Sequence, residues 1–328
     1  MAGSFVYSAK NISIENDIIT CELATVNNTY IVNKKKIQPN ISYDNFNGVL
    51  TPSNYENSYF IVLHNQLGNC LRTAISGLIV AEHYHKHPFI IFDNVHSEKE
   101  KVVISCLFRS YLVFHPVDFI HLNYEDSVDY ETFYGTNYDV ICEGKMKNID
   151  NYDKCGIINT IYSIIPENMS EELFIRKKIQ MYQSLALPRE LITNVTQFMK
   201  SNDLTNCVGM HIRYSDNLND TSKMIHQFNT PIDIFETKLN SLHQKILLCS
   251  DNASILNKFQ FRENIICPDK CSDKHFQGFY EMCLLAQCKY IIGSDSSTFS
   301  YEAAFIKGTD IELYVNNAWK KYEIEKYR

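Results

Sequence analysis

The stretch SYFIVLHNQLGNCLRTAISGLIVAEHYHKHPFIIFD, residues 58–93, decides the fold class. Its segment Tyr59–His64 is a continuous apolar run, which is typical of a strand buried in a parallel sheet. A polar loop follows, and apolar residues then recur at helical spacing from Leu71 to Ile79, ahead of a second apolar run at Phe89–Asp93. This strand–helix–strand order predicts a Rossmann-like α/β unit.

A second α/β series begins near Asn206, where apolar runs again alternate with helical patterns. The strands predicted there are Cys207–Ile212, Ile246–Cys249, Ile265–Cys267, Tyr290–Ile292 and Ile311–Val315, with helices at 252–259, Phe279–Gln287 and Ser300–Ile306. In the first half, further strands are predicted at Tyr111–Phe114 and Tyr138–Cys142. Residues 171–200 read as helices that join the two halves.

Residues 5–50 follow a different pattern, with short alternating runs separated by turn signals at Asn16-Asp17 and Asn27-Asn28. We therefore expect an α/β chain of three parts. These are a small β appendage at residues 1–50, a Rossmann-like domain at 51–200 and a second Rossmann-like domain at 201–328.

The bulk composition excludes some classes of protein. A chain of 328 residues with 45% hydrophobic residues has enough length and apolar content for two folded domains. Its net charge of -7 argues against general nucleic-acid binding, which needs a basic field. Met1–Ser4 do not begin a signal peptide and no apolar run reaches the length of a membrane span. The expected location is cytoplasmic, unless a membrane anchor has been removed.

The cysteines favour free thiols over a metal site. There are 11 of them, an odd number, in a long chain without a signal peptide. The pairs Cys267-x3-Cys271 and Cys283-x4-Cys288 invite a zinc interpretation, but their spacings depart from the usual C-x2-C. We expect no metal.

Polar residues cluster where the first predicted strand ends. His64, Gly68 and Asn69 lie in the loop between that strand and the following helix, and Arg72 follows in the helix. Ligands of open α/β sheets bind at such strand ends, and glycine permits close approach of the backbone. The alternative is an ordinary strand–helix turn with a cap.

The strand at 207–212 ends in a second candidate group. Because side chains alternate along a strand, His211 and Arg213 point to the same face. An arginine at a strand end can bind a pyrophosphate through two parallel hydrogen bonds and offset leaving-group charge. The alternative is a structural ion pair between Arg213 and Asp216.

Two further strand ends carry polar residues. Asp251 follows the strand at 246–249, where it is suited to accept hydrogen bonds from a base or ribose, or to cap the next helix. The strand at 290–292 leads into a run of small hydroxyl residues and then a helix, whose free N–H groups form an anion site. The alternative there is a serine-rich helix cap. The candidate residues of this run are Ser296, Ser297, Thr298, Phe299 and Ser300.

In this order, the segments resemble the GT-B fucosyltransferase superfamily, which covers α-1,2-, α-1,6- and protein O-fucosyltransferases. His211-Ile212-Arg213-x-x-Asp216 is similar to its H-x-R-x-x-D motif, and Ser297–Ser300 is similar to the S-T-F-S segment of α-1,2-fucosyltransferases. Gln66–Asn69 resembles their G-L-G-N-Q loop, with Gln66 in place of the first Gly and Cys70 in place of the Gln. Tyr214 stands where several members carry a second arginine.

The resemblance implies two Rossmann-like domains facing each other, with an acceptor domain at 51–200 and a donor domain at 201–328. It also implies GDP-fucose as donor substrate, a glycan hydroxyl as acceptor, inversion at the anomeric carbon, and neither cofactor nor metal. The absence of an Asp-x-Asp motif agrees with this. Arg213, Asp216 and His64 are the catalytic candidates. The residues expected to bind the donor are Gly68, Asn69, His211, Arg213, Asp251, Ser296, Ser297, Thr298, Phe299 and Ser300.

Residues 3–50 resemble one half-repeat of a cyanovirin-type lectin, through segments such as Asn11–Ile14 and Asn47–Leu50. Only Cys21 has a counterpart among the lectin cysteines. Alternatives therefore remain open: a transferase that uses another nucleotide deoxysugar, or a catalytically inactive carbohydrate-binding protein. A Rossmann dehydrogenase or methyltransferase is less favoured, because no G-x-G-x-x-G follows a predicted strand.

Overall fold

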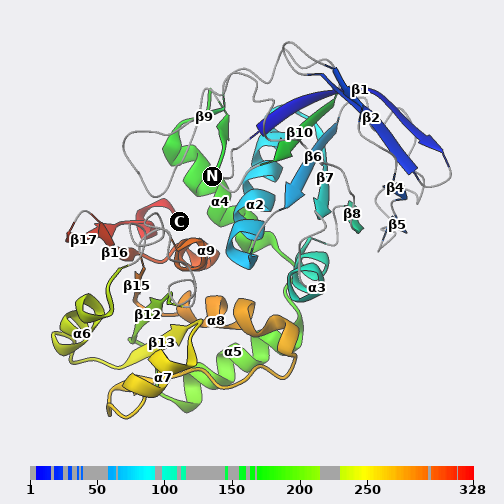
Figure 1. Ribbon diagram of the computed structural model, residues 1–328. Coiled ribbons are helices and arrows are strands. Elements are labelled where there is room, and N and C mark those ends of the chain that lie inside the picture. The colour runs from blue at the N-terminus through cyan, green and yellow to red at the C-terminus, as the bar shows by residue number, and fades with distance from the viewer. Residues whose placement is uncertain are drawn as a thin grey trace. The chain divides into compact units, whose positions relative to one another are not determined.

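The computed structural model describes part of the chain, and all structural statements below concern that part. The described residues are 5–15, 18–24, 29–31, 35–36, 38–39, 58–63, 66–92, 98–108, 112–115, 145–146, 155–159, 163–166, 168–214, 230–294, 297–315 and 317–328. The chain divides into two compact units, Met1–Lys178 and Ile179–Arg328 (Figure 1). Each unit is described by itself. The predicted strand Tyr138–Cys142 lies outside the described residues.

The first unit is built on a mixed sheet with the strand order β3-β2-β1-β10-β6-β7-β8-β5, in which β4 also pairs with β2. The strands are β1 (Phe5–Glu15), β2 (Ile18–Ala24), β3 (Thr29–Ile31), β4 (Lys35–Lys36), β5 (Gln38–Pro39), β6 (Ser58–Leu63), β7 (His87–Phe92), β8 (Leu112–His115) and β10 (Cys155–Asn159). Its central strands β10, β6, β7 and β8 run parallel. The predicted strand–helix–strand unit is confirmed as β6, helix α2 (Leu67–His83) and β7.

Helix α2 is a core helix, because nearly every residue from Gly68 to Ala81 is buried. It packs closely on the sheet at Gly77, where a Cβ atom would lie 2.7 Å from the side chain of Ile61. Its buried Ser76 hydroxyl donates to the carbonyl of Ile164 and accepts from the same residue's N–H, at 3.1 and 2.6 Å. The apolar spacing from Leu71 to Ile79 therefore reflects burial on most sides of the helix.

The remaining elements of the first unit are helix α3 (Glu98–Leu107), the short parallel pair β9 (Lys145–Met146) and β11 (Ile165–Pro166), and the start of α4 (Glu171–Ser184). The N-terminal strands belong to the main sheet, since β1 pairs antiparallel with β10 from Phe5↔Asn159 to Ser8↔Gly156. The alternating sequence pattern predicts strands here but does not predict that β1 pairs with β10. A separate lectin-like role for residues 1–50 stays a prediction.

The second unit contains a six-stranded sheet with the order β14-β13-β12-β15-β16-β17. Its strands are β12 (Val208–Ile212), β13 (Ile246–Ser250), β14 (Ile265–Ile266), β15 (Tyr290–Gly293), β16 (Ile311–Val315) and β17 (Ala318–Tyr322). All neighbours are parallel except the edge pair β16 and β17. In chain order the parallel strands lie as 3-2-1-4-5, which is the Rossmann arrangement.

Helices cover both faces of this second sheet (Figure 1). They are α5 (Arg189–Ser201), α6 (Ile232–Asn240), α7 (Ala253–Phe259), α8 (Gln277–Leu285) and α9 (Thr298–Lys307), with 3₁₀ turns η5 (Lys274–Phe276) and η6 (Glu325–Tyr327). Val208, Met210 and Ile212 point to one face and pack with Phe235 of α6 and Phe259 of α7. Because strand side chains alternate, the residues between them face α8 and α9.

The division between the units falls at Lys178/Ile179, whereas the sequence pattern suggested 200/201. The reason is that α5 and the end of α4 pack on the second unit. Phe198 of α5 lies edge-on to Tyr280 of α8, with ring centroids 6.4 Å apart. The hydroxyl of Tyr182 donates to the buried carboxylate of Glu302 in α9 at 2.6 Å.

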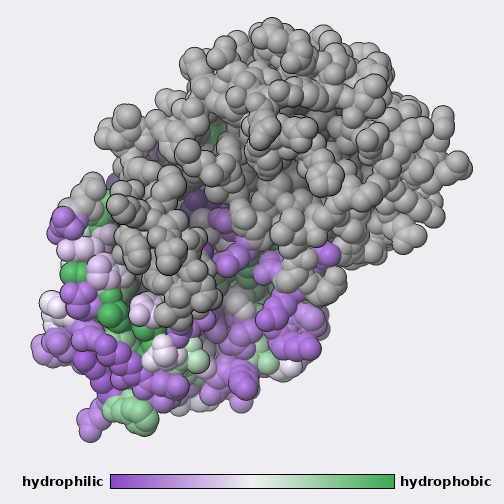
Figure 2. All heavy atoms as spheres, in the orientation of Figure 1, coloured by the Kyte–Doolittle hydropathy of each residue, from purple (hydrophilic) through white to green (hydrophobic). Residues whose placement is uncertain are grey.

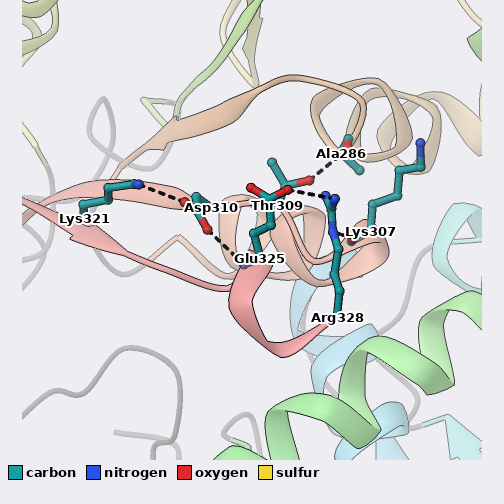
Figure 3. Close-up of polar contacts among 7 residues, drawn as sticks. All are labelled: Ala286, Lys307, Thr309, Asp310, Lys321, Glu325 and Arg328. Carbon is teal, nitrogen blue, oxygen red and sulfur yellow. Dashed lines mark hydrogen bonds and ion pairs between the residues drawn. The ribbon is translucent and has the colours of Figure 1, made fainter. Parts of the chain in front are cut away.

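The chain end is fixed to the second sheet by a group of polar contacts that we call the C-terminal clamp (Figure 3). The Asp310 carboxylate accepts from the N–H of Glu325 at 2.9 Å and pairs with Lys321 at 2.9 Å. Arg328 donates from Nε to the carbonyl of Lys307 at 2.6 Å. At the same turn, the Thr309 hydroxyl donates to the carbonyl of Ala286 at 2.9 Å.

The coloured part of the surface in Figure 2 is mainly hydrophilic, with scattered hydrophobic residues. Within the described residues, no helix has both the length and the apolar character needed to span a membrane. The predicted fold class is confirmed: the chain is α/β, and each unit has parallel strands in a Rossmann-like arrangement. The sequence pattern did not predict α6 and β17.

Candidate functional site

The candidate site lies where the strand order of the second sheet reverses. Strand β12 comes first in the chain but lies in the middle, with β13 on one side and β15 on the other. Connections leave in opposite directions from such a point, and open α/β sheets bind ligands at the carboxyl ends of the strands there. The predicted segment His211–Arg213 covers the end of β12 and the segment Ser297–Ser300 comes after β15, so the two meet at this edge.

His211, near the end of β12, is the buried centre of this site, with 4% of its surface exposed. Its Nδ1 lies 2.8 Å from the hydroxyl of Ser300 and 3.5 Å from that of Ser297. Its ring stacks on Phe299, with centroids 4.5 Å apart and planes inclined by 22°. Side chains of the S-T-F-S segment therefore bind His211 and fix the start of α9 to β12.

Burial, together with the nearby positive charge of Arg213, lowers the pKa of His211 to about 3. The imidazole is therefore neutral near pH 7, and one ring nitrogen carries a proton while the other accepts. A neutral ring lets Ser300 hydrogen-bond to Nδ1 without adding positive charge beside Arg213. This assigns His211 a role in holding the site together.

The serine-rich start of α9 does not act as a side-chain cap. Ser297 occupies the N-cap position, but its hydroxyl makes no capping bond and lies in the interior near His211. The close approach of α9 requires Gly293, because a Cβ there would lie 2.6 Å from Cβ of Ser300. The N–H groups of the first turn lack intrahelical partners, as in every helix, and they carry the positive end of the helix dipole.

Arg213 directly follows β12 and is half-buried. Its N–H donates to the hydroxyl of Ser294, the residue that follows β15, at 2.9 Å. The carbonyl of the preceding Ile212 accepts from the Ser250 hydroxyl, at the end of β13, at 2.7 Å. Side chains from both neighbouring strand ends thus hold the backbone that presents Arg213.

Asp251 makes a contact that the sequence did not indicate. Its Oδ1 accepts from the N–H of Tyr214 at 2.8 Å. The cap of α7 is the next residue, Asn252, whose side chain accepts from the N–H of Ser254. The predicted contact of Asp251 with a base or ribose stays a prediction.

Glu281 of α8 is a candidate that the sequence analysis missed. Burial raises the pKa of its partly buried carboxyl, and a hydrogen bond from Gln277 at 2.7 Å opposes that rise. The charge of Glu281 contributes to the raised pKa values of Cys249, in β13, and Cys267, which follows β14. Within the described part of the chain, Glu281 has no cationic partner. In the sequence, the feature that could have identified Glu281 is its position as a single carboxylate within the apolar helical pattern 279–285.

The first predicted loop lies in the other unit. Gly68 and Asn69 fall in the first turn of α2, which begins at Leu67 without a side-chain cap from Gln66. Gly68 is buried and Asn69 is partly buried. They follow β6, which lies between β7 and β10 at the point where the order of the first sheet reverses. The predicted position at a strand end is therefore correct, while donor binding by these residues stays a prediction.

Three predicted site residues, His64, Asp216 and Ser296, lie outside the described residues. In the part that is described, no group of three or more His, Cys, Asp or Glu side chains is arranged to hold a metal ion. Cys283 and Cys288, considered above for zinc, are buried, and Cys288 contacts Cys207 with sulfurs 3.3 Å apart.

Comparisons with known proteins find structural likeness only. No family model and no curated protein matches the sequence. Among solved structures, the NodZ α-1,6-fucosyltransferase co-crystallised with GDP has 14% identity and a TM-score of 0.48 over 81% of this chain and 98% of that chain. NodZ from Bradyrhizobium without a named ligand gives a TM-score of 0.47, with the same identity and coverage.

Two other solved structures are similar at lower scores. A point mutant of Arabidopsis thaliana FUT1 in complex with GDP has 13% identity and a TM-score of 0.44, over 80% of this chain and 71% of that chain. POFUT1 in complex with GDP has 9% identity and a TM-score of 0.38, over 77% and 95% of the respective chains. These neighbours are fucosyltransferases. At these identities, we base the functional proposal on the residues of the site.

Proposed function

We propose that this protein is an inverting, metal-independent glycosyltransferase that moves fucose from GDP-fucose to a hydroxyl of a glycan. One observation carries the proposal: Arg213 and the start of α9 meet at the carboxyl edge of a Rossmann-type sheet, joined through His211 and Ser300. A guanidinium and a helix N-terminus at one strand edge form a site for a diphosphate.

The diphosphate is the leaving group of the reaction, so its stabilisation is the main catalytic task. The acceptor oxygen attacks the anomeric carbon while the bond from that carbon to the β-phosphate oxygen breaks, and GDP leaves with an added negative charge. In this proposal, Arg213 and the N–H groups at residues 298–300 offset that charge. Their positions are fixed before reaction by the contacts of His211 and Ser294.

Glu281 supports guanine as the base. A carboxylate accepts two parallel hydrogen bonds, and guanine offers an adjacent N–H and NH₂ on one edge, whereas uracil offers a single N–H between two carbonyls. Within the described residues this partly buried carboxylate accepts from the neutral Gln277 amide and has no cationic partner, so two further donors from a base would stabilise its charge. We therefore propose Glu281 as a base-reading residue.

The proton of the acceptor hydroxyl needs a base. His211 is unsuited to this task, because a group with a pKa of about 3 is too weak a base near pH 7. Asp216 and His64 remain our proposed candidates. The α-1,2 linkage is proposed on the wording of the S-T-F-S segment alone, and Gly68, Asn69 and Asp251 are proposed as further donor contacts.

The test is release of nucleotide from a panel of donors: GDP-fucose, GDP-mannose, a UDP-sugar and other nucleotide deoxysugars. We expect the highest kcat/KM with GDP-fucose, in the presence of a glycan acceptor or by slow hydrolysis without one. Preference for another deoxysugar would replace fucose in the proposal. Failure to release any nucleotide, with retained glycan binding, would support the carbohydrate-binding alternative instead.

A Glu281→Gln variant tests the base assignment within the same panel. The amide keeps the size of the side chain but replaces one acceptor with a donor, so the preference for GDP over UDP donors should fall. The matched control is Glu312→Gln, since Glu312 is also partly buried but pairs with Lys238 at 2.7 Å. Equal donor preference in wild type and Glu281→Gln would remove Glu281 from the site.

A further inference from the structure

Four successive residues at the end of β12 are held by side chains from the two neighbouring strand ends. From β15, the Ser294 hydroxyl accepts from the N–H of Arg213 at 2.9 Å and donates to the carbonyl of His211 at 3.4 Å. From β13, Ser250 donates to the carbonyl of Ile212 at 2.7 Å. Asp251 accepts from the N–H of Tyr214 at 2.8 Å.

These contacts begin where the backbone ladder ends. The parallel register of β12 with β15 stops at His211↔Gly293, and that with β13 stops at Ile212↔Ser250. Around and beyond those pairs, side-chain groups replace the backbone groups of the neighbouring strands, with hydroxyls donating to the carbonyls of 211 and 212 and side-chain oxygens accepting from the N–H groups of 213 and 214. Extended backbone outside a ladder would otherwise have several accessible φ/ψ states, and the direction of the Arg213 side chain would vary with them.

We propose that Ser294 and Asp251 are positioning residues for Arg213, which fix its backbone on both sides so that the guanidinium meets the leaving diphosphate. This inference rests on the proposed function. In the positioning role each side chain acts through the N–H group that donates to it, and this role is separate from the donor contact proposed above for Asp251. Ser294 is 1% exposed and Asp251 is exposed, so the two residues hold the segment from the interior and from the surface.

The proposal predicts kinetic effects that a purely structural role would not produce. Misplacing a catalytic group by about 1 Å costs up to about 100-fold in rate. We expect Ser294→Ala to lower kcat/KM for the donor by up to about 100-fold. Most of the loss should fall on kcat, because the leaving-group charge that Arg213 offsets grows toward the transition state.

The matched control is Thr309→Val. Thr309 makes the same kind of buried bond, from its hydroxyl to a backbone carbonyl, in the same unit but at the opposite end of β16 from the site. We expect Thr309→Val to lower the melting temperature about as much as Ser294→Ala while its donor kinetics stay at wild-type values. Equal kinetic losses in the two variants would overturn the positioning role.

Two substitutions at Asp251 distinguish the effect of its hydrogen bond from the effect of its packing. Asp251→Ala removes the acceptor for Tyr214, whereas Asp251→Asn keeps an oxygen in the same position. We expect Asp251→Ala to lower kcat/KM and Asp251→Asn to restore most of it. If the Asn variant is no better than the Ala variant, the hydrogen bond to Tyr214 is not what positions Arg213.

Amide hydrogen exchange in the ligand-free protein provides a readout that does not depend on turnover. The Arg213 amide should exchange faster in Ser294→Ala than in wild type, while the same amide in Thr309→Val stays at the wild-type rate. A wild-type protein that turns over no donor would overturn the proposed function. Wild-type turnover with unchanged kinetics in Ser294→Ala, or an unchanged Arg213 exchange rate, would overturn the positioning role alone.

Discussion

The second unit contains two polar networks at opposite edges of one sheet. The network around His211 lies at the carboxyl ends of β12 and β15, where neutral hydrogen bonds of His211, Ser294 and Ser300 adjoin the charged Arg213 and Asp251. The C-terminal clamp lies beside the start of β16, where Asp310 pairs with Lys321 and Arg328 donates to the carbonyl of Lys307. In the clamp, each of these charged side chains binds a partner within the same network.

The comparison shows two uses of buried polar groups, one that stabilises the fold and one that positions the groups of a site. In the clamp, the contacts connect the chain end to the sheet and so contribute to folding stability. In the carboxyl-edge network, neutral hydrogen bonds fix the positions of a guanidinium and a helix start, at the edge where open α/β sheets bind ligands. Changes in the first network should affect stability without affecting chemistry, whereas changes in the second should affect chemistry as well.

The largest expected effect is on turnover in Arg213→Ala. Removing one preorganised donor to a developing anion costs about 100- to 1,000-fold in kcat. The hydrogen bond with Ser294 should persist in this variant, because it uses the Arg213 backbone. Arg213→Lys should also lose activity, since a point charge cannot reproduce the planar fork. Donor turnover by Arg213→Ala near the wild-type rate would contradict the assignment.

The second-largest expected effect is on how the free energy of unfolding depends on pH. The pKa of His211 is about 3 in the folded protein, against a reference of 6.5, so only the unfolded chain takes up the proton between these values. Stability should therefore fall as the pH drops from 6.5 toward 3, by up to about 1.4 kcal/mol per pH unit. Urea unfolding at several pH values measures this slope, and His211→Gln should flatten it. Identical slopes in both proteins would count against the buried neutral imidazole.

A third prediction compares two glycines on the same face of the sheet. Gly293→Ala would place a Cβ 2.6 Å from Cβ of Ser300, an atom that cannot move without the start of α9. Gly209→Ala would meet the tip of Leu285 at 2.9 Å, which can rotate away. Both variants should lose stability, by about 1–3 kcal/mol. Only Gly293→Ala should also lose donor turnover, as measured in parallel kinetic and thermal assays.

A fourth prediction concerns the clamp. Burial opposes ionisation of Asp310, but the Glu325 N–H and Lys321 outweigh it and lower the pKa of the carboxyl. Asp310→Ala leaves that N–H without its acceptor, so we expect a loss of about 1–3 kcal/mol in unfolding free energy. In wild type, this contribution should disappear as the pH falls through the lowered pKa. Donor kinetics should be unchanged, and a large loss of kcat would break the contrast between the two networks.

The smallest expected effect is that of chelation. The sequence has no Asp-x-Asp motif, and the proposed diphosphate contacts are a guanidinium and backbone N–H groups. Donor turnover should therefore survive EDTA. Loss of turnover, restored by manganese, would show that a divalent ion shares the task that we assign to Arg213.

Much of the second unit could be predicted from the sequence, because buried parallel strands have a strong local signal. The strands at 207–212, 246–249, 290–292 and 311–315 were predicted within one or two residues of β12, β13, β15 and β16. Strand β17 was missed, since Ala318–Tyr322 lies at the exposed edge and has mostly polar residues at its exposed positions. Residues 318–322 therefore lack the apolar run that marks a buried strand.

The chemistry of the site was less predictable, because it depends on contacts between distant residues. The sequence pointed to His211 and Ser300, but not to their bond across 89 residues. It also left open whether Ser297 caps α9, and the structure shows that the Ser297 hydroxyl makes no capping bond and lies near His211 instead. Glu281 belongs to no recognised sequence motif, so its proposed role in reading the base could be inferred only from its burial in the structure.

The most direct test of the central claim is hydrogen exchange of the ligand-free protein against the same protein with GDP. The account predicts slower exchange at the amides of Thr298, Phe299 and Ser300, whose N–H groups would gain phosphate oxygens as partners. It predicts no change at the amides of Lys321, Glu325 and Arg328 in the C-terminal clamp, and no protection of 298–300 in Arg213→Ala at the same GDP concentration. Protection by GDP elsewhere in the chain, with unchanged exchange at 298–300, would contradict the account.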